Sequence, residues 1–305
     1  MGQDCREYQE IFCKLEKLQP LYVRCQLDKN IFTIDVEDWF HILENTAVPP
    51  IDQWDRLESR IEKNVNKLLE LLNEYGVKAT FFWLGWVAER NKKLVERCKK
   101  EGHEIASHGY THFLFNETEK EDFKKDILHS KELLEDIVGA PVLGFRAPGF
   151  SITERTRWAF GVIKEAGYEY DSSIFPVQHG HGGIPGSELV PYTIQTQYGP
   201  LIEFPMSVIE MAGKKFSVFG GGYLRLSPLW LIKWGIRHLE KNNRPLVLYI
   251  HPREIDPHHR RLPLGFKRNF KCYVNLHTTL KKIEWLSQHN KFITMEDYVL
   301  SNKIF

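Results

Sequence analysis

Two histidines placed four residues apart, His108 and His112, are the first side chains of this sequence that could bind a metal ion. They come directly after a short apolar stretch at 104–107. On a helical turn, side chains at positions i and i+4 lie on one face and can reach the same ion. A chain with 13 histidines also produces such pairs by chance. The pair alone therefore does not separate a metal site from two surface histidines.

Acidic and imidazole groups also stand at the ends of two other apolar runs. The run at 32–38 reads FTIDVED and ends in three carboxylates, and the run at 246–251 reads LVLYIH and ends in His251. A hydrolase that uses a metal ion needs carboxylates and imidazoles gathered around one point. The three segments together indicate that chemistry, although a lone histidine at a strand end is more often a core residue.

Strand-like and helix-like segments alternate along the chain, which predicts an α/β fold with parallel strands and crossover helices. Arg146 and Asp171, like the groups above, fall at or just past the C-terminal end of a predicted strand, and in parallel α/β folds that edge carries the active site. The glycine-rich stretch 176–226 is interpreted as an insertion of loops and β-hairpins. The predicted strands are 30–35, 77–84, 104–107, 142–145, 168–172, 246–250 and 292–295, and the predicted helices are 59–75, 91–100, 118–139, 153–166, 227–241 and 275–289.

The composition is that of a soluble globular protein. The chain has 305 residues, of which 42% are hydrophobic and 27% charged, and its net charge of +1 gives no reason to expect nucleic-acid binding. The five cysteines are odd in number and form no C-x-x-C pair, which is typical of a reducing compartment. No apolar window reaches the ~18 residues of a membrane span, and the N-terminal region has no signal-peptide core. We expect a cytoplasmic protein without an integral membrane segment; the sequence does not indicate its oligomeric state.

The segments at the strand ends resemble those of the polysaccharide deacetylases of the NodB-homology type, carbohydrate esterase family 4. The five ordered motifs of that family all have counterparts between about residues 31 and 256. The segments 35–41 (DVEDWFH), 84–90 (LGWVAER), 144–152 (GFRAPGFSI) and 251–257 (HPREIDP) are similar to a branch found with exopolysaccharide biosynthesis loci of the exosortase/PEP-CTERM kind, which carries a C-terminal extension.

The resemblance implies a distorted (β/α)7-type barrel, one divalent metal ion, and hydrolysis of N-acetyl groups on hexosamine polymers. Zn²⁺ is the expected metal, with Co²⁺, Mn²⁺ or Ni²⁺ as alternatives, and an N-acetylated glycan is the expected partner. The expected organisation is an N-terminal extension at 1–28, a deacetylase barrel at 29–250 that includes the insertion, and a C-terminal extension at 251–305 that completes the barrel.

Carried over motif by motif, the resemblance gives each polar residue a role. His108 and His112 match the two metal-binding histidines, and Asp35 matches the catalytic base. Arg146 matches the arginine that holds this base. His251 matches the general acid, which an adjacent carboxylate would make cationic, and Asp171, the aspartate of the fourth motif, is the candidate partner.

The sequence departs from the family pattern in the first motif, where the metal-binding aspartate normally follows the base directly. Here Val36 occupies that position and cannot bind metal. The third ligand must then be Asp38 or Glu37, and we favour Asp38 because a turn frees the direction of its short side chain. Glu37 stays as the alternative.

Two further departures concern the substrate pocket. Gly149 stands where the family often has a tyrosine, and its backbone N–H could still face the oxyanion. Ser172 stands where a tryptophan is expected after Asp171. Other candidate substrate-binding residues are Trp39, Phe150 and Tyr110, whose rings could stack on sugars or fill the core.

Three functions are compatible with these residues. The first is an N-deacetylase that acts on a polysaccharide or a lipid-linked saccharide, with metal-activated water, an aspartate base and a histidine acid. The second is an amidohydrolase of the same fold that acts on a small cyclic amide or imide, for which the 180–222 region would form a lid. The third is a non-catalytic sugar-binding protein, which is disfavoured because candidates for base, acid and metal ligands are all present.

Overall fold

The computed structural model describes residues 30–43, 47–114 and 118–301. A nine-stranded sheet forms its centre, in the order β10-β1-β2-β3-β4-β5-β7-β6, with β11 paired to β1 beside this path. The predicted extension 1–28 lies outside the described residues, as do Cys5, Cys13 and Cys25. The strands are β1 Asn30–Val36, β2 Thr80–Trp83, β3 Glu104–Ser107, β4 Gly144–Phe145, β5 Tyr170–Asp171, β6 Tyr192–Thr196, β7 Gly199–Glu203, β10 Val247–Ile250 and β11 Phe292–Ile293, and β8 Ile209–Met211 pairs with β9 Lys214–Phe216 separately.

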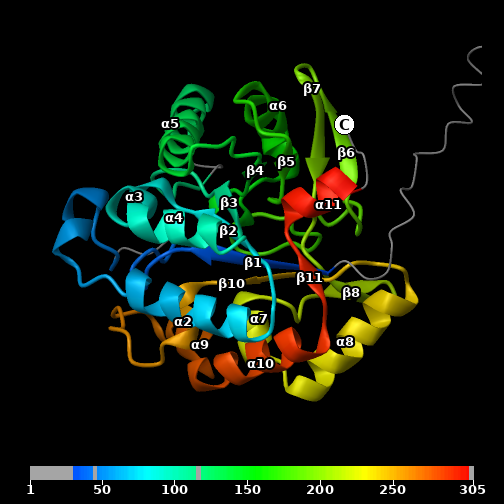
Figure 1. Cartoon of the computed structure of the whole chain (residues 1–305). Helices are drawn as coiled ribbons and strands as arrows, with labels where there is room; N and C mark the ends of the chain where they lie inside the picture. The colour runs from blue at the N-terminus through cyan, green and yellow to red at the C-terminus, as the bar shows by residue number, and fades with distance from the viewer. Residues whose placement is uncertain (1–29, 44–46, 115–117, 302–305) are drawn as a thin grey trace, which may run out of the picture.

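Helices connect successive strands and pack around the sheet (Figure 1). Helix α2 shows why the sequence folds this way, since its buried side chains recur at helical spacing and Gly76 follows its end with φ 63°. The helices are α2 Ile61–Glu74, α3 Gly85–Arg90, α4 Lys92–Lys100, α5 Lys120–Val138, α6 Trp158–Glu165, α7 Gly221–Leu226, α8 Leu229–Lys241, α9 Phe266–Tyr273, α10 Leu276–His289 and α11 Met295–Ser301, with 3-10 turns η1 Ile51–Arg56, η3 Pro148–Phe150, η4 Glu154–Thr156 and η5 Pro252–Ile255.

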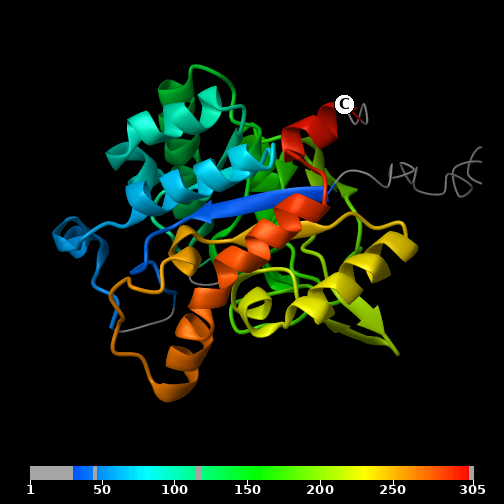
Figure 2. The same cartoon turned by 60° about the horizontal axis from the view of Figure 1, so that its bottom comes forward.

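The sheet is curled like a barrel that does not close (Figure 2). Strands β10, β1, β2, β3, β4, β5 and β7 are neighbours in parallel, in an order that is a cyclic permutation of their order in the chain. Strand β6 adds to β7 in antiparallel fashion, and within the described residues no ladder joins β6 to β10. The predicted α/β fold of the NodB-homology type is confirmed, as a curled, partly open sheet.

Alternating residues of the strands face two different cores. On β1, Phe32 and Ile34 belong to the large outer core under the helices, whereas Ile31 belongs to the inner core enclosed by the curled sheet. Asp35 lies two residues beyond Thr33 on the same inner face, because side chains of a strand alternate between its faces. The C-terminal end of β1 therefore directs Asp35 into the concave side of the sheet.

The stretch 176–226 is more than an insertion. It contains two β-hairpins, as predicted, but β7 of the first hairpin also pairs in parallel with β5, and Asp171 lies opposite Glu203 in that ladder. The stretch thus supplies a strand of the curled sheet. Its last part forms α7, with Gly220 just before the helix and Gly221 and Gly222 as its first two residues.

The N-terminal end of the curled sheet is covered by α11. Glu104 at the start of β3 accepts hydrogen bonds from Thr80 Oγ1 (2.6 Å), Tyr170 Oη (2.6 Å) and the backbone N–H of Glu296 (3.0 Å). The C-terminal end is left for the polar groups described below. Among the described residues, no helix is both long enough and apolar enough to cross a lipid bilayer.

Candidate active site

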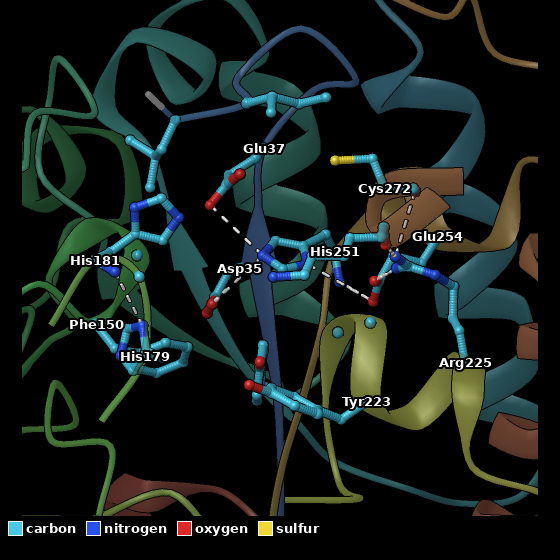
Figure 3. A pocket seen from close by; sticks show the side chains of 18 of the residues that line it. Asp35, Glu37, Phe150, His179, His181, Tyr223, Arg225, His251, Glu254 and Cys272 are labelled. Carbon is cyan, nitrogen blue, oxygen red and sulfur yellow. Dashed lines mark hydrogen bonds and ion pairs between the residues drawn. The ribbon is translucent and has the colours of Figure 1, made fainter. Parts of the chain in front are cut away.

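A cavity of about 340 Å³ lies at the C-terminal end of β1 and β10, where Asp35, Glu37 and His251 line it. The three side chains point toward one another from two adjacent strands (Figure 3). The cavity also has an apolar wall, formed by Leu43, Phe150, Phe175, Tyr223, Leu226 and Tyr249. Carboxylates, imidazoles and aromatic rings are thus present around one space.

Glu37 joins the two histidines of the H-x-x-x-H segment. Its Oε1 lies 3.0 Å from His108 Nε2 and 2.9 Å from His112 Nε2, and all three side chains are buried. Burial would raise the pKa of Glu37, but the nearby His112 and His251, together with His108, outweigh it and hold this pKa well below its usual value. Glu37 is therefore an ionised carboxylate between two imidazoles.

These three residues fit a divalent metal ion. Each offers one ligand atom, and the three atoms lie within 4.8 Å of one another. His108 Nδ1 lies 2.8 Å from the carbonyl oxygen of Arg146, and because a carbonyl only accepts, Nδ1 carries a proton and Nε2 is the nitrogen that faces Glu37. His112 Nε2 is buried without a hydrogen bond of good geometry. Two imidazoles and one carboxylate are a usual ligand set for zinc.

Asp38, the ligand favoured from the sequence, lies elsewhere. Its Oδ1 accepts a hydrogen bond from the N–H of Trp39 (2.8 Å), and its Oδ2 accepts one from the N–H of Arg60 (3.0 Å) at the N-terminal end of α2. The turn that follows β1 therefore directs Asp38 to the backbone that precedes α2, and the alternative carboxylate, Glu37, is the one beside the histidines.

Arg146 and Asp35 form a buried ion pair on the inner face of the sheet. Arg146 Nη1 donates to Asp35 Oδ1 (2.6 Å) and to Thr33 Oγ1 (2.7 Å), while Nε donates to the carbonyl of Ser172 (3.1 Å) and Nη2 to its hydroxyl (2.9 Å). Four bonds fix the guanidinium, so the geometry agrees with the expected role of Arg146 in holding Asp35. The second oxygen, Oδ2, lies 4.0 Å from His251 Nε2.

His251 stands between three carboxylates. Its Nε2 lies 3.7 Å from Glu37 Oε1 and 4.0 Å from Asp35 Oδ2, and its Nδ1 lies 3.6 Å from Glu254 Oε2. Burial nevertheless dominates and lowers the pKa of His251 to about 4, although Glu37 and Asp35 act in the opposite direction. The expected cationic histidine is thus a neutral imidazole in this structure.

Glu254, rather than Asp171, is the carboxylate beside Nδ1 of His251. Glu254 Oε2 also accepts a hydrogen bond from the backbone N–H of His251 (3.2 Å), and Oε1 contacts Nη1 of the buried Arg225 (Figure 3). Arg225 is held by the carbonyls of Lys271 (2.6 Å) and Val274 (3.2 Å). Glu254 therefore contacts both the backbone and the ring of His251, and Arg225 holds Glu254 in place.

Asp171 faces the outer side of the sheet, and no interaction given for the described residues joins it to His251. Its carboxylate accepts bonds from the hydroxyl (2.6 Å) and N–H (3.0 Å) of Ser173, whose hydroxyl in turn accepts from the N–H of Ala147 (2.8 Å). Burial and the neighbouring Asp171 raise the pKa of Glu203 well above its usual value. The two carboxyls share a proton, and the bonds of Asp171 through Ser173 support the backbone beyond Arg146.

The expected substrate-binding residues divide into two groups. Gly149 and Phe150 line the cavity, and both have positive φ angles, 61° and 51°. A Cβ on Gly149 would meet Leu43 Cδ1 at 2.5 Å, so the end of the Leu43 side chain would have to shift to admit one. Trp39 is buried in the outer core, and Tyr110 lies in a separate hollow where its hydroxyl donates to Glu89 (2.9 Å). Neither of these two rings lines the cavity.

Sequence reasoning assigned no role to three residues that the site contains. Glu254 and Arg225 carry no motif signal of their own, although Glu254 lies three residues after His251 within the conspicuous HPREIDP segment. His41 is buried beside His112, with 5.8 Å between ring centroids, and its Nδ1 accepts a hydrogen bond from the N–H of Asp38 (2.9 Å). It ends the DVEDWFH segment, which is the signal that could have marked it.

Comparison with known proteins agrees with this arrangement. Residues 52–170 match the family model described as polysaccharide deacetylase, and residues 172–300 match a domain of unknown function, DUF3473. A peptidoglycan-N-acetylglucosamine deacetylase of Bacillus cereus is 40% identical over 103 residues, which are 34% of this chain and 46% of that protein. A peptidoglycan deacetylase of Helicobacter pylori is 28% identical over 116 residues, or 37% of this chain and 38% of that protein. The chain thus spans less than half the length of these relatives.

Solved structures agree in fold. A Mycobacterium smegmatis protein assigned to the polysaccharide deacetylases superposes with a TM-score of 0.62 at 19% identity, over 92% of this chain and 91% of that one. The PuuE allantoinase superposes with a TM-score of 0.58 at 16% identity, over 92% of both chains. The fold is therefore shared by more than one kind of enzyme. The matched residues 52–170 include His108, His112 and Arg146, so this part of the chain matches the polysaccharide deacetylase family.

Proposed function

We propose that this protein is a metal-dependent hydrolase that removes N-acetyl groups from hexosamine units of a polysaccharide or a lipid-linked saccharide. The observation that carries the proposal is the cluster of Glu37, His108 and His112 beside Asp35 and His251, at one end of a sheet in a chain of the deacetylase family. The motif resemblance alone places the substrate in exopolysaccharide biosynthesis.

Glu37, His108 and His112 would hold one divalent ion, with Zn²⁺ best suited to nitrogen and oxygen ligands in this number. Co²⁺, Mn²⁺ and Ni²⁺ accept the same ligand types. When bound, the ion supplies an activated water and polarises the acetyl carbonyl. Asp38 takes no part in this set, because both of its oxygens accept backbone hydrogen bonds.

Asp35 acts as the base that accepts the proton of the attacking water. Its Oδ1 is bonded to Arg146 and its Oδ2 is directed toward His251, so the free oxygen faces the cavity. The guanidinium holds the carboxylate in one orientation. The N–H of Gly149, at the cavity wall, would face the oxyanion that forms on the acetyl group.

His251 returns a proton to the amine that leaves. Since its pKa is lowered to about 4, the imidazole begins the reaction neutral and must first receive a proton. Asp35 Oδ2, 4.0 Å from Nε2, is the group placed to pass on the proton taken from water. Glu254 beside Nδ1 stabilises the imidazolium during this transfer. His251 thus works as a proton relay between the base and the leaving group.

Acetate release from a panel of N-acetylated oligosaccharides, with and without a chelator, tests the proposal. We expect release that a chelator abolishes and added Zn²⁺ restores, and a loss on the order of 100-fold or more in Asp35→Asn. Allantoin in a parallel assay tests a small cyclic amide as substrate. Release that persists in chelator, or turnover of allantoin only, would contradict the proposal.

A further inference from the structure

Helix α9, Phe266–Tyr273, presents apolar and basic side chains to solvent. Phe266 is 89% exposed and Phe270 is 52% exposed, and the exposed Lys267 and Lys271 lie next to them along the helix. Residues four apart lie on one face of a helix, so each pair forms a row. We call these four residues the α9 outer face. The phenylalanine side chains have no group that can form a hydrogen bond with water. Exposed apolar patches of this kind mark interaction sites.

The segment that contains this face is strongly basic. Between residues 257 and 271 the sequence has five lysines and arginines and no aspartate or glutamate, whereas the whole chain has a net charge of only +1. Arg260 and Arg261, in the loop before α9, are exposed like the two lysines. The two phenylalanines therefore lie within a segment that has a local excess of positive charge.

The α9 outer face adjoins the candidate active site. Lys271, and next to it Cys272, line the cavity, as do Tyr223 and Leu226 of α7, which are 42% and 45% exposed. Arg225 of α7 joins the two helices, because its Nη2 donates to the carbonyl of Lys271 (2.6 Å). Exposed side chains that also line the cavity must lie at its opening, so α9 and α7 form part of the rim.

We propose that the α9 outer face docks the protein on the surface of an anionic lipid bilayer. A helix with apolar rings on one side and lysines beside them lies in the headgroup region, where the rings enter the acyl boundary and the lysines meet phosphates. A ring that is 89% exposed has too few neighbours to form a groove for a sugar chain, but a bilayer closes around it.

The rim position gives the docking a consequence for the substrate. With α9 and α7 against the bilayer, the cavity opens toward the membrane surface, where saccharides attached to lipids are held. The proposed hydrolase would then act on lipid-linked saccharides, and this second statement rests on the proposed function. The membrane contact itself does not, since it follows from surface residues that need no reaction.

Vesicle flotation of the full chain tests the membrane contact. We expect binding to vesicles made of phosphatidylglycerol and phosphatidylcholine in equal amounts, weakened by salt, and little binding to phosphatidylcholine alone. Phe266→Ala combined with Phe270→Ala should weaken partitioning at least about tenfold, because two apolar rings no longer enter the bilayer. Lys267→Glu should weaken it at least about fivefold.

Matched controls separate the face from general surface effects. Tyr198→Ala removes another exposed ring, 44% accessible on the β6–β7 hairpin, and Lys92→Glu makes the same charge change on α4; both should bind vesicles like the unmodified chain. The proposal would be overturned if the chain bound uncharged vesicles equally well, or if the control variants lost as much binding. It would also be overturned if dextran sulfate released the protein and the phenylalanines made no difference to binding; that outcome would assign the face to a polyanionic glycan.

The same variants keep the two proposals apart. Phe266, Lys267 and Phe270 do not line the cavity, so acetate release from a soluble N-acetylated oligosaccharide should stay unchanged while vesicle binding falls. If neither the unmodified chain nor any variant releases acetate, the proposed deacetylase function is contradicted. The vesicle result still shows whether the α9 outer face binds a membrane. If oligosaccharide activity falls with vesicle binding, the α9 outer face is part of the substrate site and docking is contradicted.

Discussion

At the scale of single residues, the choice between Glu37 and Asp38 depends on where the turn after β1 directs each carboxylate. Sequence reasoning favoured Asp38 because a turn should free its direction. The turn does so, but it directs Asp38 to the N–H of Arg60, 22 residues later. A hydrogen bond to a backbone group so far along the chain leaves no periodic signal in the sequence. For this reason the sequence could not decide between Glu37 and Asp38 as the third ligand.

The two carboxylates should respond differently to loss of charge. Glu37→Gln should lower metal affinity by at least about tenfold, because it removes the carboxylate that, among the described residues, forms a possible ligand set with His108 and His112. Asp38→Asn should keep metal binding and lose about 1 kcal/mol of folding free energy, since it weakens the hydrogen bonds from the N–H groups of Trp39 and Arg60. Titration calorimetry with Zn²⁺ and urea unfolding measure the two effects. Equal metal loss in both variants would contradict the assignment of Glu37.

Glu254 is expected to matter for turnover although it does not touch the proposed substrate position. Glu254→Gln should lower kcat on the order of tenfold with little change in KM, because the ring of His251 loses its charged neighbour. The variant also leaves Arg225 buried without its carboxylate, so its folding must be checked by circular dichroism.

A double-mutant cycle separates positioning from general damage. If Glu254 acts through His251, Glu254→Gln should cost almost nothing further in a His251→Ala background. Asp171→Asn, a buried carboxylate on the other side of the sheet, serves as the comparison and should add its full effect to that of His251→Ala. Additive losses for Glu254→Gln would show that it does not position the histidine.

At the scale of elements, close approaches between strands explain much of the local sequence. Strand β4 consists only of Gly144 and Phe145, and it lies beside β5 where Tyr170 fills the inner core. A Cβ on Gly144 would meet the Tyr170 ring at 1.9 Å. The sequence predicted a strand over 142–145, but it could not show that one of its residues must lack a side chain.

Replacing two glycines by alanine should therefore have opposite effects. Gly144→Ala should destabilise the fold by about 2 kcal/mol or more, because the tyrosine and its hydrogen bond to Glu104 must shift. Gly161→Ala, in the middle of α6 with no atom within 4 Å of the new Cβ, should stabilise by about 0.5–1 kcal/mol through helix propensity. Chemical denaturation of both variants measures the difference, and a stable Gly144→Ala protein would contradict the packing of β4 against β5.

At the scale of the whole molecule, sequence periodicity predicted the parallel α/β arrangement and the strand ends that carry Asp35, Arg146 and His251. These follow from short-range patterns, because a buried strand and an amphipathic helix each have a period that can be read locally. The parallel pairing of β7 with β5 and the outward face of Asp171 depend on contacts between distant segments, and neither leaves such a period. For this reason Asp171 was predicted as the partner of His251, whereas the carboxylate that lies beside its Nδ1 is Glu254.

Glu104 links distant parts of the molecule at the N-terminal end of the sheet, and its ionisation should be visible in global stability. Burial raises its pKa from 4.5 to about 7, while bonds from Thr80, Tyr170 and Glu296 oppose the change. Between these two values the unfolded chain has released the proton and the folded chain has kept it. The free energy of unfolding should therefore fall as pH rises through this window, by on the order of 3 kcal/mol from this group.

Comparison with Glu104→Gln isolates that contribution from other titrating groups. The glutamine has no proton to release, so the variant should lose less stability than the unmodified chain as the pH rises from about 4.5 to about 8. An amide keeps the size and most hydrogen bonds of the acid. The unmodified chain should therefore exceed the variant in free energy of unfolding by most at low pH, and this difference should narrow or reverse above pH 7. Urea unfolding at several pH values measures this difference in free energy of unfolding. A difference that widens as the pH rises would mean that Glu104 is ionised in the folded protein and stabilises it in that form.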